Sequence, residues 1–131
     1  MDTLKVWHEV MTTHNFEKLA SLLDDDVIFI SPVVHTPQVG AGITLKYLTA
    51  AAHILGTDKF KYVREIQDSA GAILEFETEI DGKYINGVDM IKWNEAGQIT
   101  EFKVMVRPLQ AVNTLHAEMG KMLAQAQKAT N

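Results

Sequence analysis

Asp89 is the residue of this sequence best placed to do chemistry. It stands in the alternating, mostly apolar segment Tyr84–Trp93, a pattern typical of a strand with one buried face. Gly87 and Ile91 share its face, so we predict that the carboxyl group points into the protein. A buried carboxylate costs several kcal/mol unless it is paired, hydrogen-bonded or protonated. Asp89 is therefore either a tuned acid in a pocket or a structural acid held by hydrogen bonds, and both interpretations stay open.

His35 is the second candidate for chemistry. It lies in a short loop that ends at Pro37 and follows the apolar run Val27–Ser31. An imidazole titrates near neutral pH, so a His35 that faced Asp89 across a pocket would place a base beside an acid. The alternative is a loop histidine that faces water.

Four further residues are predicted to bind a ligand in such a pocket. Trp7 and Ser31 would offer hydrogen bonds, and Phe29 and Tyr47 would form walls. The other aromatic residues, Tyr62 among them, are assigned to the core. The histidines lack the spacing of metal ligands and no dinucleotide or phosphate loop is present, so we expect neither a metal nor a cofactor.

A change in the spacing of apolar residues along the chain separates the predicted helices from the predicted strands. Apolar residues at helical spacing give way to period-two alternation after Gly56, and the triplet Asp24–Asp26 is predicted to end the second helix. In chain order we predict a helix through Leu4, Trp7 and Met11, a helix over 16–23, a strand over 27–31, a helix over 43–55, strands over 60–67, 72–80, 84–93 and 99–106, and a helix from Pro108.

Helices followed by an antiparallel meander predict an α+β fold in which the helices cover one face of the sheet. Because the last four strands are long, the sheet should twist and curl. We therefore predict a curled antiparallel sheet, a cone covered by the N-terminal helices and enclosing a pocket. The 131 residues are expected to form one domain over 1–131.

The composition of the chain limits the classes of partner that it is expected to bind. A formal net charge of −5 argues against nucleic acid, and no apolar run approaches the roughly 20 residues of a membrane span. The N-terminus lacks the features of a secretory signal, which makes the cytoplasm the expected location. Val88, Met90 and Met105 fall on the sheet face that the helices leave free, and a homodimer through that face is expected.

The order of elements resembles the nuclear-transport-factor-2-like superfamily, and more narrowly its SnoaL-like and ketosteroid-isomerase-like branches. The resemblance spans nearly the whole chain and is carried by residues 14–32, the Gly40–Gly42 helix start, residues 87–99 and residues 104–109. In ketosteroid isomerases a carboxylic acid on the strand matching 87–93 donates a hydrogen bond to the developing oxyanion. Asp89 stands at that position.

Two other isomerase positions differ in this chain. Ser31 stands before Pro32 where the resemblance places the proton-shuttling base, and Trp7 stands where it places a tyrosine. A serine with no base beside it cannot take a proton from carbon, and an indole cannot relay one. Steroid isomerisation is therefore not expected. In SnoaL-type cyclases a single acid in this part of the sheet serves as acid and base, which Asp89 alone would satisfy.

Residues and resemblance together predict a small-molecule pocket protein. It would be an isomerase, cyclase or dehydratase in which Asp89, assisted by His35, acts as acid and base on a hydrophobic carbonyl-bearing substrate. The alternative is a non-catalytic binding or accessory protein for a hydrophobic metabolite. An inward Asp89 favours the enzyme, whereas Ser31 and Trp7 favour the binder.

Overall fold

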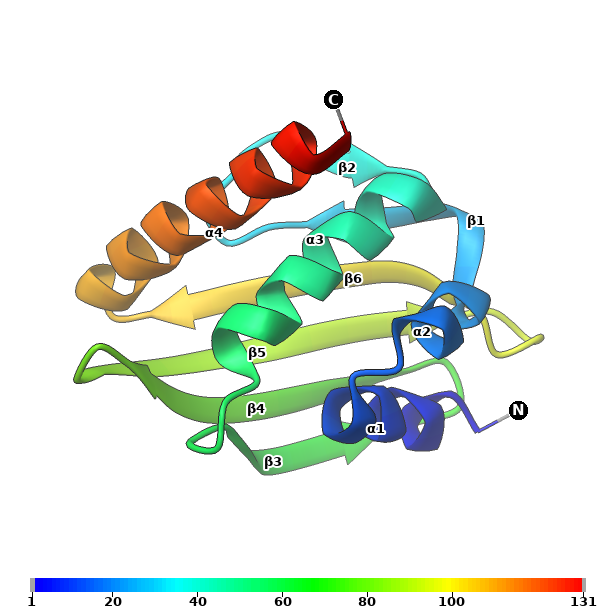
Figure 1. The fold of residues 1–131 in the computed structure, drawn as a ribbon. Helices are drawn as coiled ribbons and strands as arrows, with labels where there is room; N and C mark the ends of the chain where they lie inside the picture. The colour runs from blue at the N-terminus through cyan, green and yellow to red at the C-terminus, as the bar shows by residue number, and fades with distance from the viewer. Residues whose placement is uncertain (1, 131) are drawn as a thin grey trace.

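The computed structural model describes residues 2–130, with side chains described for residues 2–125. A six-stranded sheet, in the order β2-β1-β6-β5-β4-β3, carries the helices on one face (Figure 1). The helices are α1 (Thr3–Thr13), α2 (Phe16–Leu22), α3 (Ala41–Leu55) and α4 (Leu109–Thr130). The strands are β1 (Leu23–Ile30), β2 (Gln38–Val39), β3 (Lys61–Gln67), β4 (Gly71–Ile80), β5 (Lys83–Trp93) and β6 (Ile99–Arg107).

Side-chain caps fix the break between the first two helices. Asp2 accepts a hydrogen bond from the backbone N–H of Lys5 at 3.1 Å, and Asn15 accepts one from the N–H of Lys18 at 3.2 Å. His14 ends α1 in the left-handed conformation, with φ 57°. Caps of this kind satisfy backbone groups that a helix end leaves without partners. The predicted pair of short helices is confirmed.

The strand β1 begins earlier than predicted. Helix α2 ends at Leu22, and Asp24–Asp26 lie inside β1 rather than at the end of the helix, so that prediction was wrong. Leu23 and Val27 are buried while Asp25 is exposed. The buried apolar side chains hold this segment to the sheet, and solvent accommodates the acids between them.

The sheet is mixed rather than wholly antiparallel. The predicted meander β3–β6 is antiparallel, but β1 runs parallel to β6, with Phe29 opposite Phe102. A parallel pair needs a long crossover, and α3 with the four strands β2–β5 lies between β1 and β6 in the chain. The predicted α+β fold, a curled sheet covered by helices, is otherwise confirmed.

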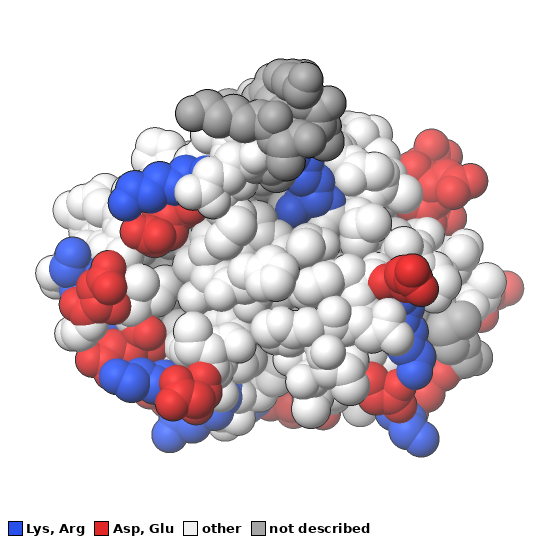
Figure 2. Space-filling view, viewed as in Figure 1, with Lys and Arg blue, Asp and Glu red and all other residues white. Residues whose placement is uncertain are grey.

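All four helices lie on the same face of the sheet, so the C-terminal helix α4 joins the N-terminal ones in covering it (Figure 1). Inward side chains of the sheet, such as Leu74 and Phe76 on β4, meet Trp7 of α1 and Leu48 of α3 in one hydrophobic core. On the helical face of the molecule, charged side chains gather at the margins around a broad uncharged centre (Figure 2). None of the described helices is long and apolar enough to span a membrane.

Candidate functional site

Asp89 lies on the inner face of β5, in the middle of the sheet. Its neighbours across the strands are Leu74 on β4 and Val104 on β6, and only 6% of its surface is exposed. Gly87 and Ile91, two residues to either side, are also buried. The alternation of β5 thus turns the carboxyl group into the protein, and the predicted inward orientation is confirmed.

Two aromatic side chains form a hydrogen-bonded chain that ends on Asp89. The indole N–H of Trp7 donates to the hydroxyl oxygen of Tyr62 at 2.9 Å. The hydroxyl of Tyr62 in turn donates to Oδ2 of Asp89 at 2.7 Å. Trp7 therefore reaches the acid through Tyr62 and not directly. Because an indole can only donate, it orients the hydroxyl of Tyr62 so that its proton points at the carboxylate.

Burial sets the protonation of this acid. Removal from water raises the pKa of Asp89 to about 7, and the hydrogen bond from Tyr62 opposes this rise because it stabilises the charged form. Burial also raises the pKa of Tyr62 well above its ordinary value, and the nearby charge of Asp89 adds to that. At neutral pH Tyr62 is a donor, while Asp89 is divided between its charged and neutral forms.

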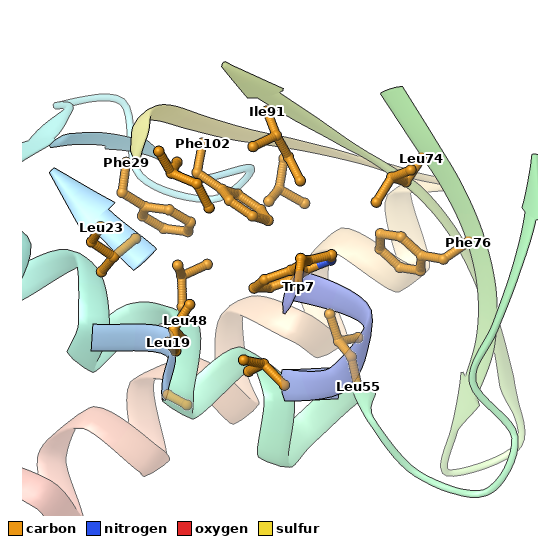
Figure 3. Close-up of a cluster of buried hydrophobic side chains, with 14 of the residues drawn as sticks. Trp7, Leu19, Leu23, Phe29, Leu48, Leu55, Leu74, Phe76, Ile91 and Phe102 are labelled. Atoms are coloured by element: carbon orange, nitrogen blue, oxygen red, sulfur yellow. The ribbon is translucent and has the colours of Figure 1, made fainter. Parts of the chain in front are cut away.

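Asp89 is one wall of an apolar cavity between the sheet and the helices. Trp7 lies at the centre of the surrounding cluster, with aromatic side chains of the sheet on one side and Leu48 and Leu55 of α3 on the other (Figure 3). The cavity is lined by Trp7, Met11, Phe29, Ser31, Pro32, Val33, Leu48, Ala51, Ala52, Leu55, Phe60, Phe76, Asp89, Phe102, Val104, Leu115 and Met119.

The cavity is narrow in this conformation. Its volume of about 40 Å³ suits a few water molecules, whereas small-molecule sites usually measure roughly 300–1,000 Å³. A larger ligand enters only if side chains move. Met11 on α1 and Met119 on α4 lie in the wall, and methionine side chains adapt readily because they are unbranched and flexible.

The structure brings together some of the predicted site residues. Trp7, Ser31 and Phe29 line the same cavity as Asp89. The hydroxyl oxygen of Ser31 accepts a hydrogen bond from the N–H of Val33 at 3.1 Å, which leaves its own proton free to donate to a ligand.

The other two predicted residues lie outside the cavity wall. Tyr47 on α3 packs against Phe29, with ring centroids 5.5 Å apart, and is not among the lining residues. His35 is exposed on the loop between β1 and β2 and does not line the cavity with Asp89. The structure therefore supplies no base to partner Asp89 at that position.

Tyr62 is the site residue that the sequence interpretation missed. The sequence analysis assigned it to the core together with the other aromatic residues of the chain. Its partner Asp89 lies two strands away, across β4, and the register that brings them together cannot be read from local pattern. Within the described part of the chain, no three His, Asp or Glu side chains form a group that could hold a metal ion.

Comparisons with solved structures place this fold among known proteins. A steroid delta-isomerase from Pseudomonas aeruginosa is 33% identical with a TM-score of 0.90, covering 96% of this chain and 92% of that chain. An uncharacterized protein conserved in bacteria, with a cystatin-like fold, from Silicibacter pomeroyi DSS-3 is 27% identical with a TM-score of 0.83, covering 91% of this chain and 83% of that chain.

A more distant likeness shows the fold alone. An NTF2-like protein of unknown function from Cytophaga hutchinsonii ATCC 33406 is 19% identical with a TM-score of 0.60, covering 82% of this chain and 88% of that chain. No family model matches the sequence, and no curated protein does. Fold, element order and the 33% identical relative agree, and the chain belongs to the NTF2-like superfamily, among its ketosteroid-isomerase-like members.

Proposed function

We propose that the cavity binds a small hydrophobic carbonyl compound and that Asp89 moves a proton on it, in an isomerisation. The observation that carries the proposal is the placement of Asp89: a buried carboxyl group, in an apolar cavity, with one oxygen held by Tyr62. A pKa near the working pH suits a group that must both take and return a proton. The likeness to a steroid delta-isomerase supports this class of reaction.

The steps follow from the groups in the wall. Ionised Asp89 takes the proton from the carbon next to the ligand's carbonyl group, and the hydroxyl of Ser31 donates a hydrogen bond to the carbonyl oxygen as it gains charge. The carbon–carbon double bond moves into conjugation when Asp89 returns the same proton to the more distant carbon. The hydrogen bond from Tyr62 holds the carboxyl group of Asp89 in place between these steps. No proton is gained or lost overall.

Asp89 therefore takes a different part from the one that the resemblance implies. There it would be a neutral donor to the oxyanion, with a separate base at the end of the first strand. Here the end of β1 carries Ser31, which is not a base. Asp89 is the titratable side chain in the described wall of the cavity, so it takes the role of base and Ser31 takes that of donor.

A simple unsaturated ketone tests the proposal. Cyclohex-3-enone is offered to the full chain, and the conjugated product is followed by its ultraviolet absorbance. Asp89→Asn should lower the rate of turnover by at least about 100-fold, since positioned acid–base groups contribute roughly 10²–10⁴-fold. Asp25→Asn makes the same substitution at an exposed acid of β1 and should leave the rate unchanged.

Binding of the product, cyclohex-2-enone, separates the two functions. If the wild type binds it but turns over no substrate, the chain is a binding or accessory protein for hydrophobic metabolites. That second function is favoured by Ser31, because a dedicated base is missing from the end of β1. An Asp89→Asn rate equal to that of the wild type would contradict the role given to Asp89.

A further inference from the structure

We infer that the cavity also binds small lipophilic ammonium ions, with the ionised carboxylate of Asp89 pairing with the charged nitrogen. The inference rests on the ligand pocket of the proposed function but not on turnover. It names a second class of ligand, one that would compete with carbonyl compounds and undergo no proton transfer on carbon.

First, Asp89 has no counter-ion among the residues that the structure describes. Among the described residues, no lysine, arginine or histidine forms an ion pair with it. Leu74 and Val104 flank it on the neighbouring strands, and α3 and α4 contribute only apolar side chains to the cavity wall. Within the described chain, the one titratable group that faces it is Tyr62 on β3.

A buried charge of this kind is incompletely compensated. One neutral donor replaces only part of the hydration that a carboxylate has in water. A cation delivered by a ligand supplies the missing partner in the same low-dielectric space, where attraction between opposite charges is strong. The formal net charge of −5 also draws cations toward the molecule.

Second, the two carboxylate oxygens of Asp89 differ in their hydrogen bonds. The indole N–H of Trp7 donates its hydrogen bond to Tyr62, and the hydroxyl of Tyr62 donates its own to Oδ2 of Asp89. Oδ1 has no hydrogen-bond partner in the part of the chain that the structure describes. In the ionised form this oxygen can only accept, so it favours a ligand that donates. An ammonium N–H makes the stronger, charge-assisted form of that bond.

Third, aromatic rings form a large part of the cavity wall. Phe29, Phe76 and Phe102 of the sheet line the cavity together with Trp7 and Phe60. Trp7 and Phe102 lie 4.9 Å apart between ring centroids, and Phe60 and Phe76 lie 5.2 Å apart. Faces of aromatic rings attract cations, and the same rings cover the apolar body of a ligand. An acid set among aromatic rings fits a hydrophobic amine in its charged form.

Benzylammonium and its neutral isostere benzyl alcohol test the inference. Binding to the full chain is followed by the NMR signal of the Trp7 indole N–H, which lies in the cavity and which Trp93→Phe assigns. With a pKa of about 7, Asp89 is about one-tenth ionised at pH 6 and about nine-tenths ionised at pH 8. Benzylammonium should therefore bind about tenfold more tightly at pH 8, while the alcohol should show little change.

Asp89→Asn keeps the shape of the side chain and removes its charge. It should weaken benzylammonium binding at pH 8 at least about tenfold, abolish the pH dependence and leave the alcohol bound. Asp25→Asn is the matched control and should behave as the wild type. The comparison of benzylammonium with benzyl alcohol on the wild type at pH 8 needs no variant, so it tests the inference even if Asp89→Asn fails to fold.

Each outcome has one meaning. If the alcohol binds and benzylammonium does not at pH 8, this inference is overturned and the pocket of the proposed function stands. If neither binds, the inference and the pocket both fail. Asp89→Asn protein that binds benzylammonium at pH 8 as tightly as the wild type would also overturn the inference, because the cation would then be bound without the carboxylate. A loss of cyclohex-3-enone turnover in otherwise ligand-binding protein bears only on the proposed function.

Discussion

The behaviour of Asp89 follows from its surroundings at the scale of single side chains. Apolar neighbours raise its pKa, and the Trp7–Tyr62 chain limits the rise by donating to Oδ2. The two effects together leave the pKa of the acid near neutral pH. The alternation of β5 was enough to predict the direction of the side chain. The hydroxyl that holds it could not be predicted, because it arrives from a strand that is not adjacent to β5.

Burial of this acid predicts a dependence of stability on pH. The unfolded chain releases the proton of Asp89 near its ordinary pKa of 3.8, whereas the folded chain keeps it until about pH 7. Between these values the folded state holds the extra proton, so this group makes the free energy of unfolding fall as pH rises, and the fall ends above about pH 7. A shift of about three pKa units corresponds to a loss of about 4 kcal/mol at most.

Urea denaturation of wild type and Asp89→Asn at pH 4 and pH 8 checks this prediction. The variant lacks the titration, so its stability relative to the wild type should increase from pH 4 to pH 8. Asp25→Asn serves as the control and should track the wild type. A constant difference between Asp89→Asn and wild type at both pH values would show that Asp89 does not keep its proton on folding.

At the scale of elements, the site depends on how three strands align. Tyr62 on β3, Phe76 on β4 and Gly87 on β5 are partners in register, and Asp89 is two residues along from Gly87. A Cβ atom at Gly87 would approach the ring of Phe76 to 2.3 Å. The missing side chain at Gly87 thus leaves room for an aromatic ring that lines the cavity.

Gly87→Ala should therefore destabilise the protein and disturb the site. Phe76 is buried and cannot move freely, so the crowding is expected to cost about 1–3 kcal/mol in the free energy of unfolding. Gly120→Ala is the matched control, because a Cβ atom at Gly120 in α4 meets nothing within 4 Å. It should stabilise the helix by up to about 1 kcal/mol. Equal denaturation midpoints for the two variants would contradict this account of Gly87.

The elements were predicted unevenly for physical reasons. Period-two alternation located β3–β6 within a residue or two, and apolar residues at helical spacing located the first two helices. The sequence pattern could not show that β1 begins at Leu23, because acids at Asp24–Asp26 read as a break while the buried residues around them hold the strand. The local sequence pattern also cannot show whether β1 pairs with β6 in a parallel or an antiparallel direction.

At the scale of the whole molecule, the outer face of the sheet offers an apolar band. Ile66 on β3 pairs with Ile73 on β4, and Ile73 pairs with Met90 on β5. The next row places Val88 opposite Met105 on β6. Ile66 is 63% exposed and Met105 is 50% exposed, which is unusual for large apolar side chains. Bands of this kind are commonly covered by a protein partner, and a second copy of the chain is the partner we propose.

Light scattering at micromolar concentration tests the proposed dimer. The wild type should show the mass of two chains, and Ile73→Lys should reduce it to one because a lysine charge would be buried in the interface. Val39→Lys, at an exposed residue of β2 outside the band, should remain dimeric. A monomeric mass for the wild type would rule out the proposal.

The helices cover a cavity in the middle of the molecule, and in its wall Asp89 is a buried acid whose pKa lies near neutral pH. Its titration can be followed directly through the carboxyl carbon signals of protein labelled with ¹³C at aspartate, with Asp89→Asn assigning the Asp89 signal. We expect a midpoint at about pH 7 for that signal. A midpoint near pH 4, as for an aspartate in water, would contradict it.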